Sequence, residues 1–451
     1  MKHRILYFLI LAISAMNMSC GKEFLEKKTS KQLLVPATLT DFQSLLDNTS
    51  KMNKTPAMQL LTGDEFAPPD NGWEGLGGAE PRNHFLWADN IYEGAGTGEW
   101  NIPFEQVLIA NVVLDGLETL SAMDRETDTY RQLKGSALFY RAIAYHALTE
   151  RFTAPYREAF AATLPGVPVN VSSDINIRPG RGTLKQLYGQ MISDLNAAIP
   201  LLPVNITYNS RPSKPAAYAL LSRLYLLMQD YSQAYDHVML CLGIYDKLHD
   251  FNLATPYSIG GGNAEVIFNT GYLNYTFLNS TLVYVEQDLY NSYETNDWRK
   301  TYYFVSRSNG RYTFRPSNFS SNNGRFSGIA MDEVYLIKAE CLIRAHRVDE
   351  GLDVLNNLLI TRYKSGSYQP YAWLEQKDAL NLVLAERKKE LISRGLRWSD
   401  LRRLNLDPDH AVTITHVIKG QTYTLKPNDP KYVFPIPNNE ISLSGIAQNE
   451  R

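Results

Sequence analysis

The chain has 451 residues, of which 44% are hydrophobic and 20% are charged, a composition typical of a globular protein. Its formal net charge of −2 gives no reason to expect nucleic acid or an anionic membrane surface as a partner. The chain is longer than one small hydrophobic core requires, so we expect a helical array or two to three substructures. The 28 tyrosines and 6 tryptophans favour a ligand surface over a bare scaffold.

The first nineteen residues have the shape of an export signal. Basic residues at positions 2–4 precede a short apolar core at Ile5–Ile13, which is too short to span a bilayer. Cys20 directly follows, and its place resembles the lipobox of bacterial lipoproteins, in which the cysteine is acylated and becomes the new N-terminus. The alternative is ordinary signal cleavage between residues 14 and 19, which would leave Cys20 as a free thiol.

The other two cysteines, Cys241 and Cys341, each lie on the apolar face of a predicted helix. Such thiols are usually small buried hydrophobes, so the sequence predicts no disulfide framework. No apolar stretch after residue 20 is long enough to cross a membrane, which leaves the lipid on Cys20 as the only expected membrane contact.

A charged tether follows Cys20, and Thr40 with Gln43 predicts a capping box that opens a short helix. The segment 63–100 is rich in glycine and proline and has no helical period. It nevertheless contains half of the tryptophans of the chain, at positions 73, 87 and 100. A long loop of this kind is rarely filler, so we expect it to carry function.

Helices are predicted over 103–120 and 130–152, where apolar residues recur at helical spacing. A connection rich in proline and glycine spans 155–182. Thr183 and Gln186 then predict a second capping box, and the helix that they open ends before Pro200.

Residues 213–242 predict two helices that pack against each other. Ser213 can cap the first helix, whose early Pro215 has no amide hydrogen to lose. The spacing is that of a tetratricopeptide repeat, with small residues at Ser222 and Ala234 that let the helices approach closely. One such pair cannot bury its faces alone, so further repeats are expected, and the spacing recurs in the helices at 130–152 and 331–344.

From residue 251 to 319 the helical period disappears, and short strands are predicted at 265–268 and 311–315. Helices return at 331–344, 349–363 and 377–394, the last ending at Gly395 as a C-cap. A hairpin that turns at Lys419 and Gly420 is predicted near the end.

Catalytic and metal-binding spacings are missing from the sequence. It has no HExxH, GxSxG or Walker loop, and no two histidines have metal-ligand spacing on one helix. The acidic neighbours Asp64–Glu65 and Asp332–Glu333 could be read as acid and base, but adjacent side chains point in different directions. The sequence therefore predicts neither an enzyme nor a metal or cofactor site.

Several segments together resemble the SusD/RagB family of outer-membrane nutrient-binding lipoproteins. The resemblance covers most of the mature chain, and Arg394 departs from it, since the family usually has Glu before this glycine. The segments are the helix with Trp100, Phe104 and Asn111; residues 133–156, LKGSALFYRAIAYHALTERFTAPY; the pair at 213–242; MDEVYLIKAE at 331–340; ERKKELISRGLRWSDLRR at 386–403; and Pro435–Glu440.

This resemblance implies a mainly α fold, a tetratricopeptide-like helical array with long aromatic-rich insertions and a few short strands. A single domain is expected over 20–451. Its array would occupy about 40–62, 103–152, 183–245 and 331–403, and its ligand-loop insertions about 63–100 and 251–330. The resemblance also implies a lipid-anchored protein on the outer membrane, facing the cell exterior, which presents oligomeric nutrients to a TonB-dependent, SusC-like transporter.

Position and chemistry indicate the candidate ligand residues, because aromatic faces cover the apolar side of a sugar ring and polar neighbours satisfy its hydroxyls. Trp100, Trp373 and Trp398 are assigned to the fold. The candidates are Asp70, Trp73, Asn83, Trp87 and Tyr92 in the first insertion, and Tyr284, Tyr293, Trp298 and Arg299 in the second.

Two further hypotheses stay open at this stage. The same architecture could capture oligopeptides, through backbone hydrogen bonds and pockets rather than stacked rings. It could also be a scaffold that contacts only the transporter. The charged residues of 386–403 are interpreted as structural ion pairs and not as an active site, because buried charges persist mainly when paired.

Overall fold

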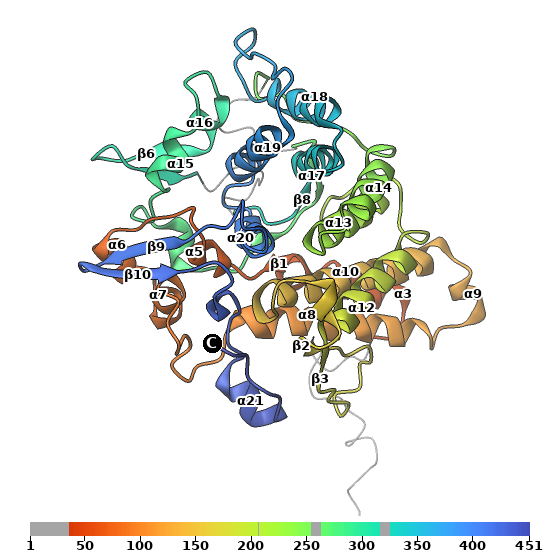
Figure 1. Ribbon diagram of the computed structural model, residues 1–451. Coiled ribbons are helices and arrows are strands. Elements are labelled where there is room, and N and C mark those ends of the chain that lie inside the picture. The colour runs from red at the N-terminus through yellow and green to blue at the C-terminus, as the bar shows by residue number, and fades with distance from the viewer. Residues whose placement is uncertain (1–35, 206, 254–262, 316–324) are drawn as a thin grey trace, which may run out of the picture.

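The computed structural model describes residues 36–205, 207–253, 263–315 and 325–451. The predicted export signal and Cys20 lie outside the described residues. Most of the described chain is helical, and the longer helices form an array of antiparallel neighbours (Figure 1). The prediction of a mainly α, tetratricopeptide-like fold is confirmed. The array helices are α3 (Leu39–Leu46), α8 (Gly98–Leu117), α10 (Asp128–Phe152), α12 (Leu184–Ala198), α13 (Lys214–Leu227), α14 (Tyr231–Leu242), α17 (Met331–Arg344), α18 (Val348–Leu359), α19 (Gln376–Glu390) and α20 (Leu396–Leu404).

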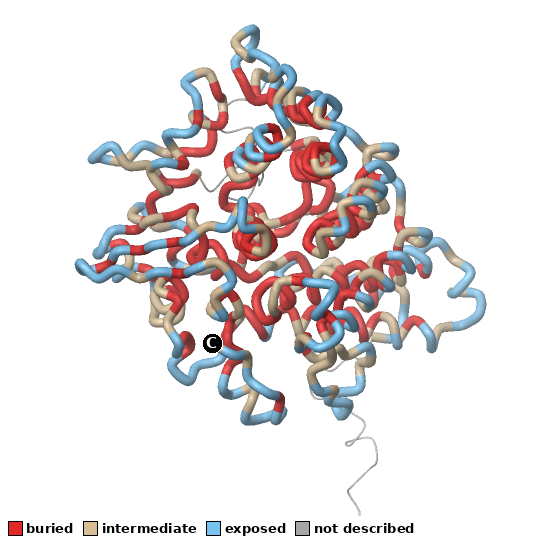
Figure 2. Tube along the Cα trace, in the orientation of Figure 1, coloured by how far each residue is buried: buried red, intermediate tan, exposed pale blue. Residues whose placement is uncertain are grey.

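Successive helices of the array contact one another. Helix α10 packs on α8 and α12, α13 on α14, α14 on α17, and α17 on α18 and α19. Figure 2 shows that buried residues concentrate where these helices face each other, whereas exposed residues follow the connecting loops. The buried side chains form one large apolar cluster and a smaller one around α17, α18 and α19.

The predicted pair at 213–242 forms as expected. The Ser213 hydroxyl accepts a hydrogen bond from the Ala216 amide, and Pro215 lies in the first turn. Ser222 and Ala234 are both fully buried between α13 and α14. The α17–α18 pair uses a still smaller residue, because a Cβ on Gly351 would lie 2.5 Å from Ile343. Small residues therefore set the close approach of both pairs.

Short helices and strands connect the array and line its edges. The strands form five two-stranded pairs among the described residues, with β1–β5 parallel and the other four antiparallel. The helices are α4 (Thr49–Met52), α5 (Gln59–Thr62), α6 (Asp70–Glu74), α7 (Ala79–Phe85), α9 (Ala122–Arg125), α11 (Glu158–Ala161), α15 (Gln287–Asn291), α16 (Trp298–Tyr302) and α21 (Asn438–Ser444). The pairs are β1 (Lys54–Thr55) with β5 (Gly271–Tyr272), β2 (Pro165–Pro168) with β3 (Arg181–Thr183), β4 (Val266–Phe268) with β8 (Ile329–Ala330), β6 (Phe304–Ser306) with β7 (Tyr312–Phe314), and β9 (Ile414–Ile418) with β10 (Gln421–Leu425).

Two helix starts differ from the prediction. The first capping box is made by Thr38 and Asp41, not by Thr40 and Gln43, because Thr38 has the extended backbone of a cap and Asp41 bonds back to its amide. Helix α8 begins at Gly98, five residues before Pro103. The proline removes only one amide donor, and the buried ion pair of Glu99 with Arg151, 2.9 Å long, fixes the extra turn.

Gly395 has a different role from the predicted C-cap. Helix α19 ends at Glu390, and Gly395 is the cap residue that precedes α20, with a left-handed φ of 73°. A Cβ there would lie 2.6 Å from the Tyr272 hydroxyl oxygen and from the Gln59 side-chain nitrogen. Glycine is required both by its backbone conformation and by the lack of space.

The charged residues of 386–403 form ion pairs, as predicted. The Arg387 and Arg403 guanidinium groups each donate to Asp400 at 2.8 Å, and Arg403 also binds Glu340 at 2.7 and 2.8 Å. These contacts tie α20 to α19 and α17. Arg394, which departs from the family pattern, donates to Asp332 at 2.9 Å and so joins α17 by another route.

Candidate functional site

Most of the first insertion packs inward. The Trp87 indole is 2% exposed, stacks on His416 with ring centroids 4.4 Å apart, and donates to the Thr62 carbonyl at 3.0 Å. The Tyr92 hydroxyl donates to the Pro435 carbonyl at 2.9 Å. Both residues were predicted as ligand contacts, but their rings fill the core and present no face to solvent.

Three candidates of the second insertion are also buried. Tyr284 lies under the Arg311 guanidinium, and the Tyr293 hydroxyl donates to the Lys389 carbonyl at 2.7 Å. Arg299 is completely buried. Burial therefore removes these two rings and this guanidinium from the candidate ligand surface.

The Arg299 guanidinium is the centre of an ion-pair network. It donates to the carboxylates of Asp297, Glu386 and Glu390 at 2.7 to 3.0 Å. Burial alone would raise the pKa of Glu386, but Arg299 and Lys389 lower it below its ordinary value. A guanidinium that is paired in this way and fully buried joins three carboxylates of the fold and is out of reach of a sugar hydroxyl.

The polar candidates of the first insertion hold local structure. The Asn83 amide donates to the carbonyls of Asn90 and Ile91 and to the Glu93 carboxylate. Asp70 is exposed at the start of α6 and accepts from the Lys419 amide at 2.8 Å. The predicted β9–β10 hairpin turn therefore lies against α6, and Figure 1 shows the hairpin alongside α6.

Trp73 is half-buried on α6. Its indole nitrogen donates to the Arg82 carbonyl at 3.2 Å, and the cationic groups of Arg82 and Lys419 lie 5.9 and 5.6 Å from the ring centroid. Lys419 also pairs with Glu74 at 2.6 Å. The Trp73 indole is thus held in place by a hydrogen bond, and two cations of the protein already lie near its ring.

Trp298 is half-buried at the start of α16. It stacks on Tyr302 with an angle of 3° between the rings, and its nitrogen donates to the Asn252 side chain at 2.8 Å. The Lys364 ammonium lies 5.3 Å from the ring centroid. The ring is held from beneath and from one edge by the protein, and the rest of it remains partly accessible.

An open polar pocket lies beside this tryptophan. Its volume is about 590 Å³, which is within the range of small-molecule sites. Lys364 belongs to both places, since it approaches the Trp298 ring and lines the pocket. The lining residues are Asn291, Tyr293, Glu294, Thr295, Asn296, Lys300 and Lys364.

Internal hydrogen bonds fix the wall of this pocket. The Asn296 amide donates to the Ser367 carbonyl at 3.1 Å, and the Lys300 ammonium donates to the Tyr293 carbonyl at 2.6 Å. The loop after α18 is thereby tied to the α15–α16 segment. The resulting surface combines amide, hydroxyl, carboxylate and ammonium groups, which can hydrogen-bond to the hydroxyls of a sugar.

The three tryptophans assigned to the fold differ in burial. Trp100 and Trp398 are buried, as predicted, but Trp373 is 66% exposed in the loop between α18 and α19. The assignment of Trp373 to the fold was wrong. Its sequence position between two helices gave no sign of this, because a loop side chain can turn either way.

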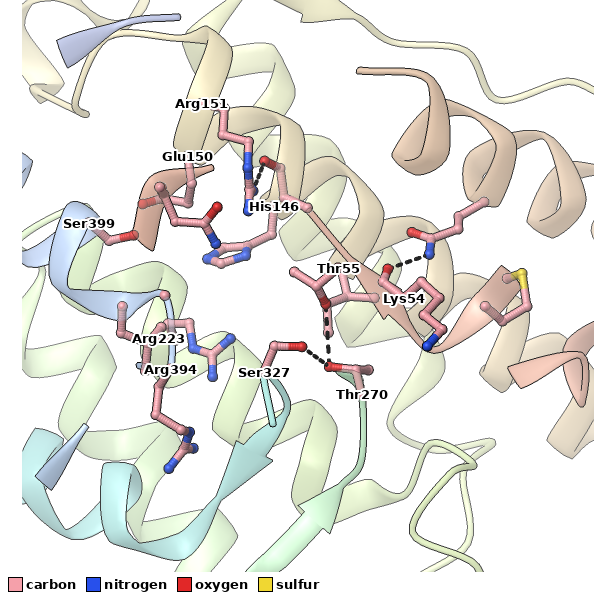
Figure 3. Close-up of a pocket in the computed structure, with 17 residues that line it drawn as sticks. Lys54, Thr55, His146, Glu150, Arg151, Arg223, Thr270, Ser327, Arg394 and Ser399 are labelled. Carbon is pink, nitrogen blue, oxygen red and sulfur yellow. Dashed lines mark hydrogen bonds between the residues drawn. The ribbon is translucent and has the colours of Figure 1, made fainter. Parts of the chain in front are cut away.

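Another polar pocket lies inside the array, where α5, β1, α10, α13 and the start of α20 meet (Figure 3). A chain of hydroxyls crosses it, from Thr55 to Thr270 at 3.4 Å and from Thr270 to Ser327 at 3.0 Å. Its volume of about 50 Å³ has room for a few water molecules and not for a sugar.

Two of the arginines around this inner pocket are already paired. Arg223 binds Glu333 at 2.6 and 2.8 Å, and Arg151 binds Glu99. Burial, followed by the nearby arginines, lowers the pKa of His146 well below its ordinary value, so this imidazole is neutral. The His146 Nε2 atom has no hydrogen-bond partner among the described residues, so none of the hydroxyls lining the pocket is paired with it.

Metal-ligand clusters and membrane-spanning helices are absent from the ranges that the structure describes. No cluster of three or more His, Cys, Asp or Glu side chains there could hold an ion. None of the described helices has both the length and the apolar character that a membrane span requires.

Two family models match successive parts of the chain. The model described as "Starch-binding associating with outer membrane" matches residues 23–226, and the one described as "SusD family" matches residues 263–450. The chain belongs to the SusD family. The resemblance found in the sequence is thereby confirmed over most of its length.

Relatives of known structure share the SusD fold with this chain. A putative sugar binding protein from Bacteroides vulgatus superposes with a TM-score of 0.73 at 20% identity, covering 92% of this chain and 99% of that one. A laminarin binding SusD-like protein gives 0.64 at 16% identity, covering 91% and 98%. SusD-like protein P2 of Formosa agariphila is 22% identical, covering 85% of this chain and 84% of its own.

The pocket beside Trp298 could be found only in part from the sequence. The run from Asn291 to Lys300 is dense in polar residues around a tryptophan, and of these residues the sequence predicts only Tyr293, Trp298 and Arg299 as ligand contacts. Lys364 and Asn252 come from distant segments, and no local pattern marks them. Their contribution depends on how the loops pack.

Proposed function

We propose that this chain is a surface-exposed lipoprotein that binds oligosaccharides and delivers them to a TonB-dependent, SusC-like transporter of the outer membrane. Membership of the SusD family supports the proposed location at the outer membrane, since one of the matching family models is described as "Starch-binding associating with outer membrane". The lipid on Cys20 would hold the protein at the surface. Its activity is binding and not catalysis.

One observation carries the assignment of the ligand class. The half-buried Trp298 ring has the Lys364 ammonium 5.3 Å from its centroid, and Lys364 lines an open pocket whose wall also presents amide and hydroxyl groups. A sugar ring can cover the indole with its apolar face while its hydroxyls bond to this wall. A structural relative described as a laminarin binding SusD-like protein supports the same class of ligand.

Oligopeptides remain the second candidate, favoured by the charges of the same pocket. Glu294 lines this pocket together with Lys300 and Lys364, and charges of both signs could hold the termini or charged side chains of a peptide. A peptide would depend less on the Trp298 ring than on these ions, so its affinity would fall steeply with salt.

The test is calorimetric titration of the mature protein, from residue 20 or 21 onward, with panels of oligosaccharides and oligopeptides. We expect a saturable heat signal from at least one oligosaccharide, which changes little between 50 and 500 mM salt. A signal from peptides alone would replace the proposal with peptide capture. No heat signal in either panel would leave only the third hypothesis, a scaffold that contacts the transporter alone.

A further inference from the structure

A third pocket lies between the start of α8, the β2–β3 pair with its connection, and α21. Its volume is about 440 Å³, which is within the range of small-molecule sites. It shares no lining residue with the pocket beside Trp298. Figure 1 shows α21 and α16 at opposite ends of the molecule, so the two pockets are separate places on its surface.

Hydrogen bonds within the chain hold the walls of this pocket. The Asn111 amide on α8 donates to the Asn170 carbonyl at 3.1 Å, which fixes the connection from β2 to β3. The Arg181 guanidinium on β3 donates to the Ala447 carbonyl at 2.9 Å and to the Asn449 side chain at 2.7 Å. These bonds join β3 to the segment after α21. Since the walls are already ordered, binding a ligand there costs less conformational entropy.

An aromatic ring and a leucine give the pocket an apolar side. Phe104 is half-buried on α8, and its ring centroid lies 4.7 Å from that of the buried Trp100, which packs in turn on Phe152. Leu443 on α21 is 74% exposed. Both Phe104 and Leu443 line the pocket. The core thus supports the Phe104 ring at a space where a sugar ring can place its apolar face.

Two charges of opposite sign line the same pocket. Arg178 lies on the connection from β2 to β3, and Glu440 lies on α21. Within the described ranges, neither side chain has an ion-pair or hydrogen-bond partner. A small anion would meet Glu440 and a small cation would meet Arg178. A neutral hydroxyl suits both, because it can accept from the guanidinium and donate to the carboxylate, and the amide of Asn101 on the same lining can also do both.

We propose that this pocket is a second oligosaccharide site, in which a sugar ring covers Phe104 while its hydroxyls bond to Arg178, Glu440 and Asn101. This second site rests on the proposed function for its class of ligand, but not for its residues. Since α21 and α16 lie at opposite ends of the molecule, a short oligosaccharide cannot reach both pockets. One chain therefore binds two molecules of it.

Calorimetric titration of the mature chain with trisaccharides of starch, laminarin and other neutral glycans tests the second site. At least one trisaccharide should bind with a stoichiometry of two. Arg178→Ala removes an exposed side chain from the pocket, so the affinity of one of the two sites should fall about tenfold. Arg157→Ala is the matched control, since Arg157 is an exposed arginine that lines neither pocket.

A second variant tests the aromatic contact. Phe104→Leu keeps an apolar side chain and removes the flat ring, so it should weaken the same site as Arg178→Ala does. Trp298→Ala should weaken only the other site. A crystal structure at saturating trisaccharide gives a readout that needs no variant, and we expect density for a sugar ring over Phe104.

The outcomes separate the second site from the site beside Trp298. Unchanged affinities in Arg178→Ala and Phe104→Leu would overturn the second site, and the proposed function would stand if Trp298→Ala still weakens binding. Binding that persists in Trp298→Ala but weakens in Arg178→Ala would overturn only the site beside Trp298. Tripeptide binding in place of any trisaccharide, or no binding at all, would overturn both.

Discussion

Glu65 is a buried carboxyl whose environment favours the protonated form. Burial raises its pKa to about 8, and the adjacent Asp64 carboxylate adds to the rise. Asp64 itself is ionised, because Arg397 holds it through two hydrogen bonds of 2.6 and 2.8 Å. The two neighbours thus differ in charge at neutral pH although they have the same chemistry.

This difference makes stability depend on pH. Between pH 4.5 and about 8 the folded chain keeps the Glu65 proton that the unfolded chain releases, so the free energy of unfolding falls as pH rises. Glu65→Gln removes the effect and can still accept the Ser393 amide hydrogen. Denaturant titrations from pH 5 to 8 should show the variant gaining stability over the wild type, by up to about 1.4 kcal/mol per pH unit. A constant difference would contradict the assignment.

Substitution of Arg299 distinguishes a structural role of this residue from a role in ligand binding. Arg299→Ala would leave Asp297, Glu386 and Glu390 buried without their shared cation. We expect the free energy of unfolding to fall by about 3–5 kcal/mol. Chemical denaturation measures this directly. Unchanged stability together with lost oligosaccharide binding would restore the ligand role predicted from the sequence.

At the scale of elements, periodic segments were predictable and the insertions were not. The pair α13–α14 and helix α17 formed where the apolar period placed them, because packing of one apolar face decides a long helix. The segment 63–100 lacks a period, and its helices α6 and α7 depend on contacts with the β9–β10 hairpin and the core. Burial of Trp87 follows from the same contacts, which local sequence does not encode.

The turn between α19 and α20 gives a test at this scale. Gly395→Ala places a methyl group 2.6 Å from the Tyr272 oxygen and keeps a left-handed backbone, which costs about 1–2 kcal/mol before any clash. Gly189→Ala is a matched control, since Gly189 lies in α12 with open space around it. Thermal unfolding should show a lower Tm for the first variant and a slightly higher Tm for the second. Equal Tm values would refute the close approach.

At the scale of the molecule, the family and the array were accessible from sequence, whereas the ligand surface was not. Ordered motifs spread over the chain identify a family even when each is weak alone. A surface site is different, because Trp298, Lys364 and Asn252 meet only after three segments have packed. Residue chemistry selected Trp298, whose ring is half-buried, but it also selected Trp87 and Tyr293, whose rings are buried in the core.

The predicted anchor gives a second whole-molecule test. Cys20→Ser removes the thiol that would be acylated, so metabolic labelling with a fatty acid should be lost and the protein should leave the membrane fraction. The same labelling of Cys241→Ser provides the control, since Cys241 is buried. Label that persists in Cys20→Ser would contradict the lipid anchor.

The most direct test of the proposed function is the dissociation constant of an oligosaccharide for the wild type, Trp298→Ala and Phe160→Ala. Phe160 is an exposed aromatic residue on α11, which contributes nothing to the pocket beside Trp298. We predict that Trp298→Ala weakens binding at least tenfold, as expected for loss of a stacked ring, and that Phe160→Ala leaves it unchanged. Equal affinity of all three proteins would show that the sugar binds elsewhere.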